Sequence, residues 1–424
     1  MLNLTSHLVS AYRAYRRLDS HILNFILAEF FLHLVSACFF LVLNLYMRAE
    51  GYADESIGGY LAGRHLTIML LAYPVGMIIR RRPLLPWLRF SAITFPLLSF
   101  GLVLAVSQHE DFWLRVLFVF WGASFFSVRA IAAPYILRNC SPELHAEALA
   151  LNFSSWSVGM IMAGLANWGL ASINPHVFNE CTLLLGFAVV GFTSLIFVQR
   201  VGVDTYDPDS PAPKGADWWH IAKALSPVAL IAIGAGLTIQ FMNLYFNAVF
   251  GVEYDLFSLM GAATSILATM AVLLVPAIKL RFGYEGSITA TQSLAWIALV
   301  GLATMEYFAG FSWALGLAVF FYAVRQPLMN MANPMTTELL MYYVGDSNRE
   351  ITSAMTGAIW SGSWFFSSLI FSILRAQEVP YAQIFYITAA LYAAGIYGFY
   401  LLIGAFRRKT AAESSANQLQ VDGH

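Results

Sequence analysis

The chain has 424 residues, of which 59% are hydrophobic and 11% charged, and its net charge at pH 7 is −1. This composition excludes an ordinary soluble domain, in which about 25% of residues are charged, and the balanced charge gives no indication of a nucleic-acid partner. The three cysteines are spaced neither as a disulfide framework nor as a metal site. We therefore expect an all-α integral membrane protein that is embedded in the lipid bilayer and needs no metal or cofactor.

The first residues contain the basic stretch AYRAYRRLDS and no apolar core followed by a cleavage site. We interpret residues 1–21 as a cytoplasmic lead-in. Apolar windows of about 20 residues, the length that crosses a bilayer as a helix, then follow one another with short polar connections. They predict twelve spans, near 22–48, 56–79, 84–107, 112–137, 147–172, 181–199, 221–249, 256–279, 286–309, 311–337, 351–375 and 382–406.

Lys and Arg are distributed unevenly among the connections. If both termini are cytoplasmic, 17 of them lie on the inner side, 3 on the outer side and 3 inside spans. Since cytoplasmic loops carry the excess of Lys and Arg, we predict a multi-pass protein with both termini in the cytoplasm. Short loops and compact size favour a prokaryotic inner membrane, and we expect a monomer.

A stretch rich in Pro, Asp and Gly separates spans six and seven and divides the chain into two sets of six. The tail after the last span is polar and is expected to be disordered. The predicted organisation is an N-terminal half at 22–199, a cytoplasmic linker at 200–220, a C-terminal half at 221–406 and a cytoplasmic tail at 407–424.

The two halves repeat each other. NLYMRAEGYADES, from Asn44, resembles NLYFNAVFGVEYD, from Asn243, and FFSVRAIAAP around Arg129 resembles FYAVRQPLMN around Arg325. The offsets between the paired residues are 199 and 196. Near-constant offsets indicate a duplicated six-helix unit, as in transporters built from two parallel repeats.

With its two sets of six spans, its central linker and its repeat, the chain resembles the major facilitator superfamily over all twelve spans. The resemblance implies the twelve-helix fold of that family, in two pseudo-symmetric halves, with helices one, four, seven and ten lining a substrate cavity. The Arg that is frequent in the fourth helix of its proton-coupled exporters is matched by Arg129, without the Gly that usually follows.

The family's loop motif between helices two and three is kept in part. It often combines a Gly, an acid and a basic cluster, whereas YPVGMIIRRRP here keeps Gly76, Arg80 and Arg81 but has no acid. The equivalent loop of the second half, VPAIKLRFGYEG, has Lys279 and Arg281. The resemblance implies that these five residues belong to cytoplasmic gating loops.

Arg129 and Arg325 lie near the middle of their predicted spans, where a guanidinium costs from about 2.5 to well over 10 kcal/mol unless it faces protein or water. In one interpretation both project into a central cavity and hold an anionic group of the substrate. In the other, each braces backbone carbonyls freed by a nearby proline, Pro134 or Pro327. The sequence does not decide between them.

Further polar residues fall on the helices that the resemblance places at the cavity. Each can contact substrate or simply hydrogen-bond across helices for about 0.6 kcal/mol, and Trp156 and Trp360 can stack on a substrate ring or pack against neighbouring helices. The candidate substrate-binding residues, besides the two arginines, are Asn44, Trp156, Gln240, Asn243, Asn247, Gln326, Asn330, Asn333 and Trp360.

Glu29 and His33 are one helical turn apart in the first span. A carboxylate and an imidazole at this spacing can share a proton, so the pair is the candidate for proton coupling. The alternatives are a pair that only neutralises itself, or a partnership of Glu29 with Arg64 and His65. The acids and bases of the outer loops GYADESIGG and GVEYD are either gating salt bridges or solvated loop residues.

No nucleophile with a base and no phosphate-binding glycine loop occurs, so we do not expect an enzyme. The leading hypothesis is a secondary active transporter for a small polar solute, anionic or zwitterionic because the mid-span charges are mostly positive, with protons as a candidate coupling ion. The alternatives are a proton-driven exporter of amphipathic drugs or lipids, and a receptor or scaffold that binds a ligand without moving it.

Overall fold

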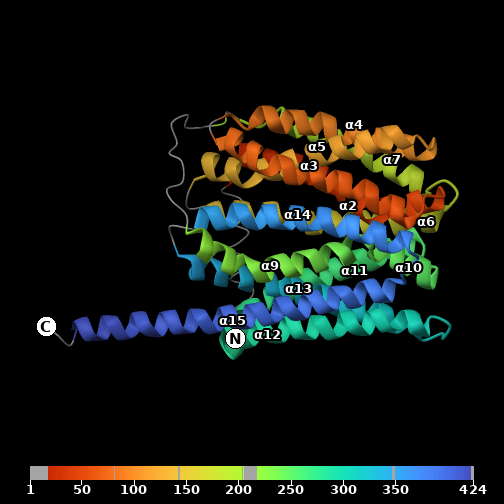
Figure 1. The fold of residues 1–424 in the computed structure, drawn as a ribbon. Coiled ribbons are helices and arrows are strands. Elements are labelled where there is room, and N and C mark those ends of the chain that lie inside the picture. Colours follow the sequence, from red (N-terminus) through yellow and green to blue (C-terminus); the bar gives the residue numbers. More distant parts are fainter. Residues whose placement is uncertain are drawn as a thin grey trace. The chain divides into compact units, whose positions relative to one another are not determined.

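The computed structural model describes residues 18–80, 82–141, 144–202, 204, 217–345 and 349–421. Within these ranges all regular structure is helical, as the apolar runs predict, because a helix in lipid satisfies its own backbone groups. The elements, most of which are labelled in Figure 1, are α2 (Ser20–Ala49), α3 (Asp54–Arg80), α4 (Leu85–Ser107), α5 (Asp111–Asn139), α6 (His145–Ile173), α7 (Glu180–Gly191), α8 (Ser194–Val198), α9 (Trp218–Thr238), η2 (Ile239–Phe241), α10 (Met242–Phe250), α11 (Tyr254–Leu273), α12 (Val275–Thr304), η3 (Met305–Phe308), α13 (Ala314–Val344), α14 (Arg349–Ala376) and α15 (Tyr381–Val421).

These helices account for the twelve predicted spans. In the described part of the chain, 10 helical stretches are long and apolar enough to cross a membrane. The remaining two predicted spans are α3 and α13, which have 27 and 31 residues and carry mid-helix charges at Arg64 and Arg325. The chain is therefore a multi-pass membrane protein whose helices match the predicted count.

Three of the predicted spans are interrupted. Residues 181–199 form α7 and α8, residues 221–249 form α9 and α10 with the 3-10 turn η2 between them, and α11 ends at Leu273 inside predicted span eight. The predicted loop between spans eight and nine is instead a break inside α12, at Gly283, whose φ of 68° favours glycine.

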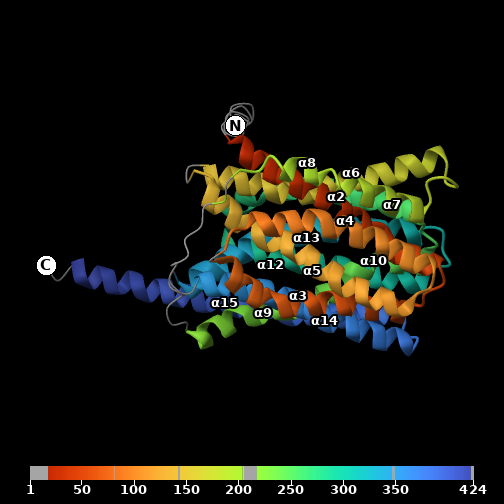
Figure 2. The same ribbon diagram turned by 90° about the horizontal axis from the view of Figure 1, so that it is seen from above.

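The tail was predicted to be disordered, and this prediction is wrong for the residues that the structure describes. Helix α15 continues past the last span to Val421 and extends beyond α9 and α12 in both views (Figures 1 and 2). The reason is local: the tail contains Arg, Ala, Gln and Leu, which favour helix, and it extends an existing helix without a new nucleation step.

The described chain forms two compact units. Unit 1 comprises the described residues of Met1–Pro211 with Gln240–Ile266 and Ser368–Gln377. Helix α2 is its centre, and it packs against α4, α6, α7 and α10, while α3 and α4 pack against α5. At Gly191 of α7 an added Cβ would lie 2.6 Å from Val35, so glycine is what allows α7 this close to α2.

Unit 2 comprises the described residues of Ala212–Ile239, Leu267–Ser367 and Glu378–His424. Helix α12 packs against α13 and α15, and α9 packs against α15. Because unit 1 takes up two segments of the predicted C-terminal half, these units differ from the duplicated halves at 22–199 and 221–406. The duplication itself stays a prediction.

Candidate functional site

A cavity of about 250 Å³ lies in unit 1 among α2, α5 and α6. Its lining combines one guanidinium, one imidazole, one amide and one indole with apolar side chains. The lining residues are His33, Arg129, Ala132, Ala133, Leu149, Asn152, Phe153 and Trp156. Three of the predicted site residues, His33, Arg129 and Trp156, therefore lie at one cavity.

Arg129 is the charged residue of this cavity. Its side chain is exposed although it lies within α5, and among the described residues its guanidinium has no hydrogen-bond or ion-pair partner. Its guanidinium contacts the ring of Phe125, four residues earlier, whose centroid lies 5.9 Å from Cζ. Glu29 and His33 lie within electrostatic reach. The geometry matches the cavity interpretation of Arg129, and its role in substrate binding stays a prediction.

Glu29 and His33 are held by different partners on α6. Asn152 donates a hydrogen bond from Nδ2 to Oε2 of Glu29. Nδ1 of His33 lies 2.7 Å from the Ser155 hydroxyl, which itself donates to the Asn152 carbonyl oxygen. Glu29 is fully buried and its Oε1 has no hydrogen-bond partner among the described residues. Glu29 and His33 therefore belong to the same polar cluster, which Asn152 and Ser155 connect. Proton sharing between Glu29 and His33 stays a prediction.

Trp156 is a partly buried wall of the cavity. Its ring meets those of His33 and Phe40 nearly edge to face, with centroids 6.0 and 6.4 Å apart, so neither ring stacks flat on the indole. Asn152 and Ser155, three residues apart, share a face of α6, and Trp156 lies beside them, four residues after Asn152. This spacing is the signal in the sequence by which the cluster could have been found.

Arg64 is a second mid-helix arginine that was not predicted as a site residue. Its guanidinium lies 4.2 Å from the ring centroid of Trp121 and 4.8 Å from that of Phe125. It does not pair with His65, which lies 3.1 Å from Oε1 of Gln240. In the sequence, the spacing of Trp121, Phe125 and Arg129 places them on one face of α5. This spacing is the signal by which an aromatic contact for Arg64 could have been sought.

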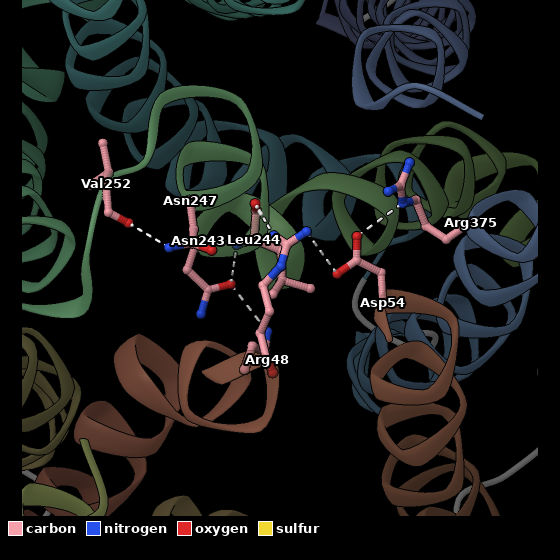
Figure 3. Close-up of polar contacts among 8 residues, drawn as sticks. Arg48, Asp54, Asn243, Leu244, Asn247, Val252 and Arg375 are labelled. Atoms are coloured by element: carbon pink, nitrogen blue, oxygen red, sulfur yellow. Dashed lines mark hydrogen bonds and ion pairs between the residues drawn. The ribbon is translucent and has the colours of Figure 1, made fainter. Parts of the chain in front are cut away.

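The helix ends on the predicted outer side carry an ion network within unit 1 (Figure 3). The carboxylate of Asp54, at the start of α3, lies 3.5 Å from Nη2 of Arg48 and 3.0 Å from Nε of Arg375. Arg48 also donates to the Leu244 carbonyl oxygen at 3.0 Å. The charges suit their positions, since an acid at a helix start and bases in last turns oppose the helix dipoles. Asp54 is 6% exposed, so this is not a solvated loop.

Asn44, Gln240 and Asn243, all predicted to bind substrate, form a hydrogen-bonded cluster beside this network. Asn44 donates to the Gln240 carbonyl oxygen at 2.7 Å and to Oδ1 of Asn243 at 3.2 Å. Asn243 donates to the Leu41 carbonyl oxygen at 3.2 Å and Gln240 to the Ser368 hydroxyl at 2.8 Å. These amides are engaged by the protein itself, and their contact with substrate stays a prediction.

Asn247 closes the end of α10. Its side-chain amide donates to the Val252 carbonyl oxygen at 3.1 Å, across a turn in which Gly251 has a φ of 67°. Figure 3 shows this contact beside Arg48 and Asn243. This placement makes Asn247 a brace of the loop, while the predicted substrate contact is not tested.

The remaining predicted binding residues lie in unit 2. Arg325 is 1% exposed and donates from Nη2 to the Tyr392 hydroxyl at 3.1 Å, while its Nε is buried without a hydrogen bond among the described residues. This hydrogen bond joins α13 to Tyr392 of α15, and the predicted contact of Arg325 with substrate is not tested. The other four candidates lie on α13 and α14 and are partly or fully exposed; they are Gln326, Asn330, Asn333 and Trp360.

The predicted gating-loop residues are only partly described. Arg81 lies outside the described residues, and Gly76 and Arg80 fall on the last turns of α3. Lys279 and Arg281 precede the break in α12, and Arg281 is exposed with Cζ 5.4 Å from the Phe282 ring centroid. Their gating role stays a prediction. Over the described ranges, no group of three His, Cys, Asp or Glu residues could hold a metal ion.

Comparison with known proteins gives the fold and leaves the substrate open. No protein-family model and no curated protein matches the chain. Among solved structures, a D-xylose-proton symporter has a TM-score of 0.69 at 11% identity, over 89% of this chain and 95% of that chain. The nucleoside transporter NupG has 0.66 at 12%, over 91% and 99%. A bacterial homologue of the human lysosomal transporter Spinster, inward-facing and unoccupied, has 0.66 at 14%, over 92% and 97%. All three are membrane transporters and none is an enzyme.

Proposed function

Because the chain has the twelve-helix fold of the major facilitator superfamily, we propose that it is a secondary active transporter that works by alternating access. Its solute is small and polar, and anionic or zwitterionic. The observation that carries this proposal is Arg129, an accessible mid-helix guanidinium without a polar partner among the described residues, at a cavity that also offers His33 and Asn152. A guanidinium at mid-depth of a bilayer is costly unless water or an anion balances it, and a solute carboxylate or phosphate would do so.

The charge around the cavity supports an anionic solute over a cationic one. Glu29 is the acid within reach of Arg129 and is already engaged by Asn152. A site for organic cations would expose carboxylates to the cavity, and its described lining contains none. In the proposal both termini are cytoplasmic, the membrane is a prokaryotic inner membrane and the protein acts as a monomer.

The proposal predicts that Arg129→Gln abolishes solute binding. The thermal stability of the purified protein is measured against matched anionic, zwitterionic, neutral and cationic metabolites. A ligand at about a hundred times its dissociation constant adds roughly 2.7 kcal/mol of stability. We expect an anion or zwitterion to raise the Tm of wild type but not of Arg129→Gln, and the same compound to enter proteoliposomes only with wild type.

The control is Arg115→Gln, which removes an arginine from the same helix at an exposed surface pair with Asp111. This variant should bind and transport like wild type. If apolar cations alone stabilise the protein, and do so equally in wild type and Arg129→Gln, the anionic solute is excluded. The exporter of amphipathic drugs or lipids then takes its place, and the apolar walls Leu149, Phe153 and Trp156 are what favour that alternative. Binding without flux would identify a receptor.

Proton coupling is assigned to Glu29 and His33. A carboxylate with one oxygen bonded to Asn152 and the other without a partner can take up a proton at the free oxygen. In vesicles that contain a pH-sensitive dye, solute entry should change the internal pH with wild type, and Glu29→Gln should transport without that change or not at all. Solute flux with no proton movement in wild type would exclude the coupling.

A further inference from the structure

The side chain of Asn152 joins the cavity to Glu29. It lines the cavity together with Arg129 and His33, and its Nδ2 donates a hydrogen bond to Oε2 of Glu29. Glu29 is fully buried and does not belong to the described lining of the cavity. A solute in the cavity therefore meets the amide of Asn152 and not the carboxylate that this amide holds.

The contact between α6 and α2 holds this amide in place. A Cβ added to Gly159, two turns after Asn152, would lie 3.5 Å from the backbone carbonyl carbon of His33, so the two helices are in contact there. Ser155 donates its single hydroxyl hydrogen to the Asn152 carbonyl oxygen. Nδ1 of His33, 2.7 Å from this hydroxyl, is therefore the donor in their hydrogen bond. His33 is thereby tied to the backbone of α6, and the side-chain amide of Asn152 is left to Glu29.

Two groups support the negative charge of Glu29. Among the described residues, Arg129 of α5 is the charged side chain that acts on it, and Asn152 of α6 is its hydrogen-bond donor. His33, on the same helix as Glu29, is also within reach of Arg129. The described parts of α4, α7, α8 and α10, which pack on α2 as well, present no further charge to Glu29. Arg129 and Asn152 both line the cavity, so a solute anion can reach both.

From this arrangement we propose that Asn152 couples solute binding to the protonation of Glu29, an inference that rests on the proposed anion transporter. The solute anion and the Glu29 carboxylate compete for the guanidinium of Arg129 and the amide of Asn152. A carboxylate that loses both is costly in the membrane interior. Glu29 then takes up one proton from water at Oε1, the oxygen without a hydrogen-bond partner among the described residues. Anion and proton favour each other's binding, so the protein is a symporter of the two.

The test measures the protons that accompany binding to the purified full-length protein in weak buffer with a pH-indicator dye. The probes are lactate, benzoate and free alanine, whose carboxylates stay ionised between about pH 5.5 and 8. Wild type should take up protons when the anion binds. Its Kd should fall as the pH falls, by up to about tenfold per pH unit, the limit for one linked proton.

Asn152→Ala should bind the same probe, more weakly, without proton uptake and with a Kd that does not change with pH. The reason is that Glu29 has lost its donor and keeps its proton whether or not solute is bound. Glu29→Gln, which cannot release a proton, should behave in the same way.

Two further variants separate coupling from packing. Asn152→Gln keeps an amide and should recover part of the proton uptake. Asn167→Ala removes another buried amide of α6, which donates to the Ser258 hydroxyl at 3.3 Å and lies outside the described lining of the cavity. This control should lower the Tm and leave the proton uptake per bound anion at the wild-type value.

The outcomes distinguish the inference from the proposed function. Anion binding by wild type without proton uptake, or with proton release, overturns the inference and leaves the anion transporter standing. Undiminished uptake in Asn152→Ala also overturns it, because the coupling then does not pass through this amide. A wild type that binds none of the probes and is stabilised by apolar cations alone excludes both. If Asn152→Ala does not fold, Asn152→Gln and the sign of the wild-type proton change decide.

Discussion

Replacing Asp54 by Asn is expected to destabilise unit 1 by about 3 kcal/mol and to loosen its predicted outer side. Breaking a buried ion pair costs about 3–5 kcal/mol because the partner charge stays buried. The lower end applies here, since the side chains of Arg48 and Arg375 keep 27% and 19% exposure and water can screen them. The loss should appear as a lower Tm of the purified protein.

Loosening is measured separately with a cysteine at Gly59, where an added Cβ lies 3.9 Å from the Ser372 hydroxyl. In a background that lacks the three native cysteines, Asp54→Asn should speed its labelling by a membrane-impermeant maleimide. Asp111→Asn is the matched control, because Asp111 pairs with Arg115 at the surface, where both side chains are more than half exposed. This substitution should change the Tm and the labelling rate only slightly. Equal effects of the two substitutions would show that the Asp54 network has no gating role.

The second large effect is expected at Gly164 of α6. A Cβ there would lie 2.4 Å from the Ser258 carbonyl oxygen and 2.8 Å from Cβ of Ala262. Since the first of these atoms is backbone, Gly164→Leu cannot be accommodated by a rotamer change and should force α11 away from α6. Overpacking costs about 1–3 kcal/mol, and the upper end or more is expected for a whole leucine side chain.

The matched control is Gly169→Leu on the same helix, where an added Cβ meets nothing within 4 Å. This substitution removes a helix glycine at an open position and should leave the Tm unchanged or slightly raised. Gly164→Leu should also expose the cysteine at Gly59 and stop solute flux. A Gly164→Leu protein with wild-type flux would mean that α6 and α11 need not touch during the cycle.

The sequence was sufficient for the spans because a bilayer imposes a length and an apolar composition that can be counted residue by residue. For Arg129 the sequence predicted a place at a cavity, because a mid-span guanidinium needs water or an anion; the side chain lies at one, and its role in substrate binding stays a prediction. Arg325 has the same local pattern, yet it is buried against Tyr392, 67 residues away. The residues next to an arginine in the sequence show that burying its charge is costly. They do not show which distant residue will contact the guanidinium.

The rest of the site depends on residues far apart in the chain. Asp54 and Arg375 are separated by 321 residues and Glu29 and Asn152 by 123, and each seemed ordinary in its own segment. The disorder predicted for the tail failed for a different reason. Polarity argues against a packed core, but it does not prevent an existing helix from continuing through good helix formers.

The division into units has a mechanical meaning. Among the described residues, the chain passes between the two units at 239–240, 266–267, 367–368 and 377–378. The first joint lies at the start of the 3-10 turn η2, the next two lie within α11 and α14, and the last lies in the connection between α14 and α15. The joints within α11 and α14 have no loop that could absorb a rotation. Gln240–Ile266 and Ser368–Gln377 are the segments of the second half that belong to unit 1. In an alternating-access cycle, these segments would have to break their contacts with α2, α3 and α6 and form new ones while their own helices stay intact. The hydrogen bonds and ion pairs at these segments would then set the energy difference between the two states.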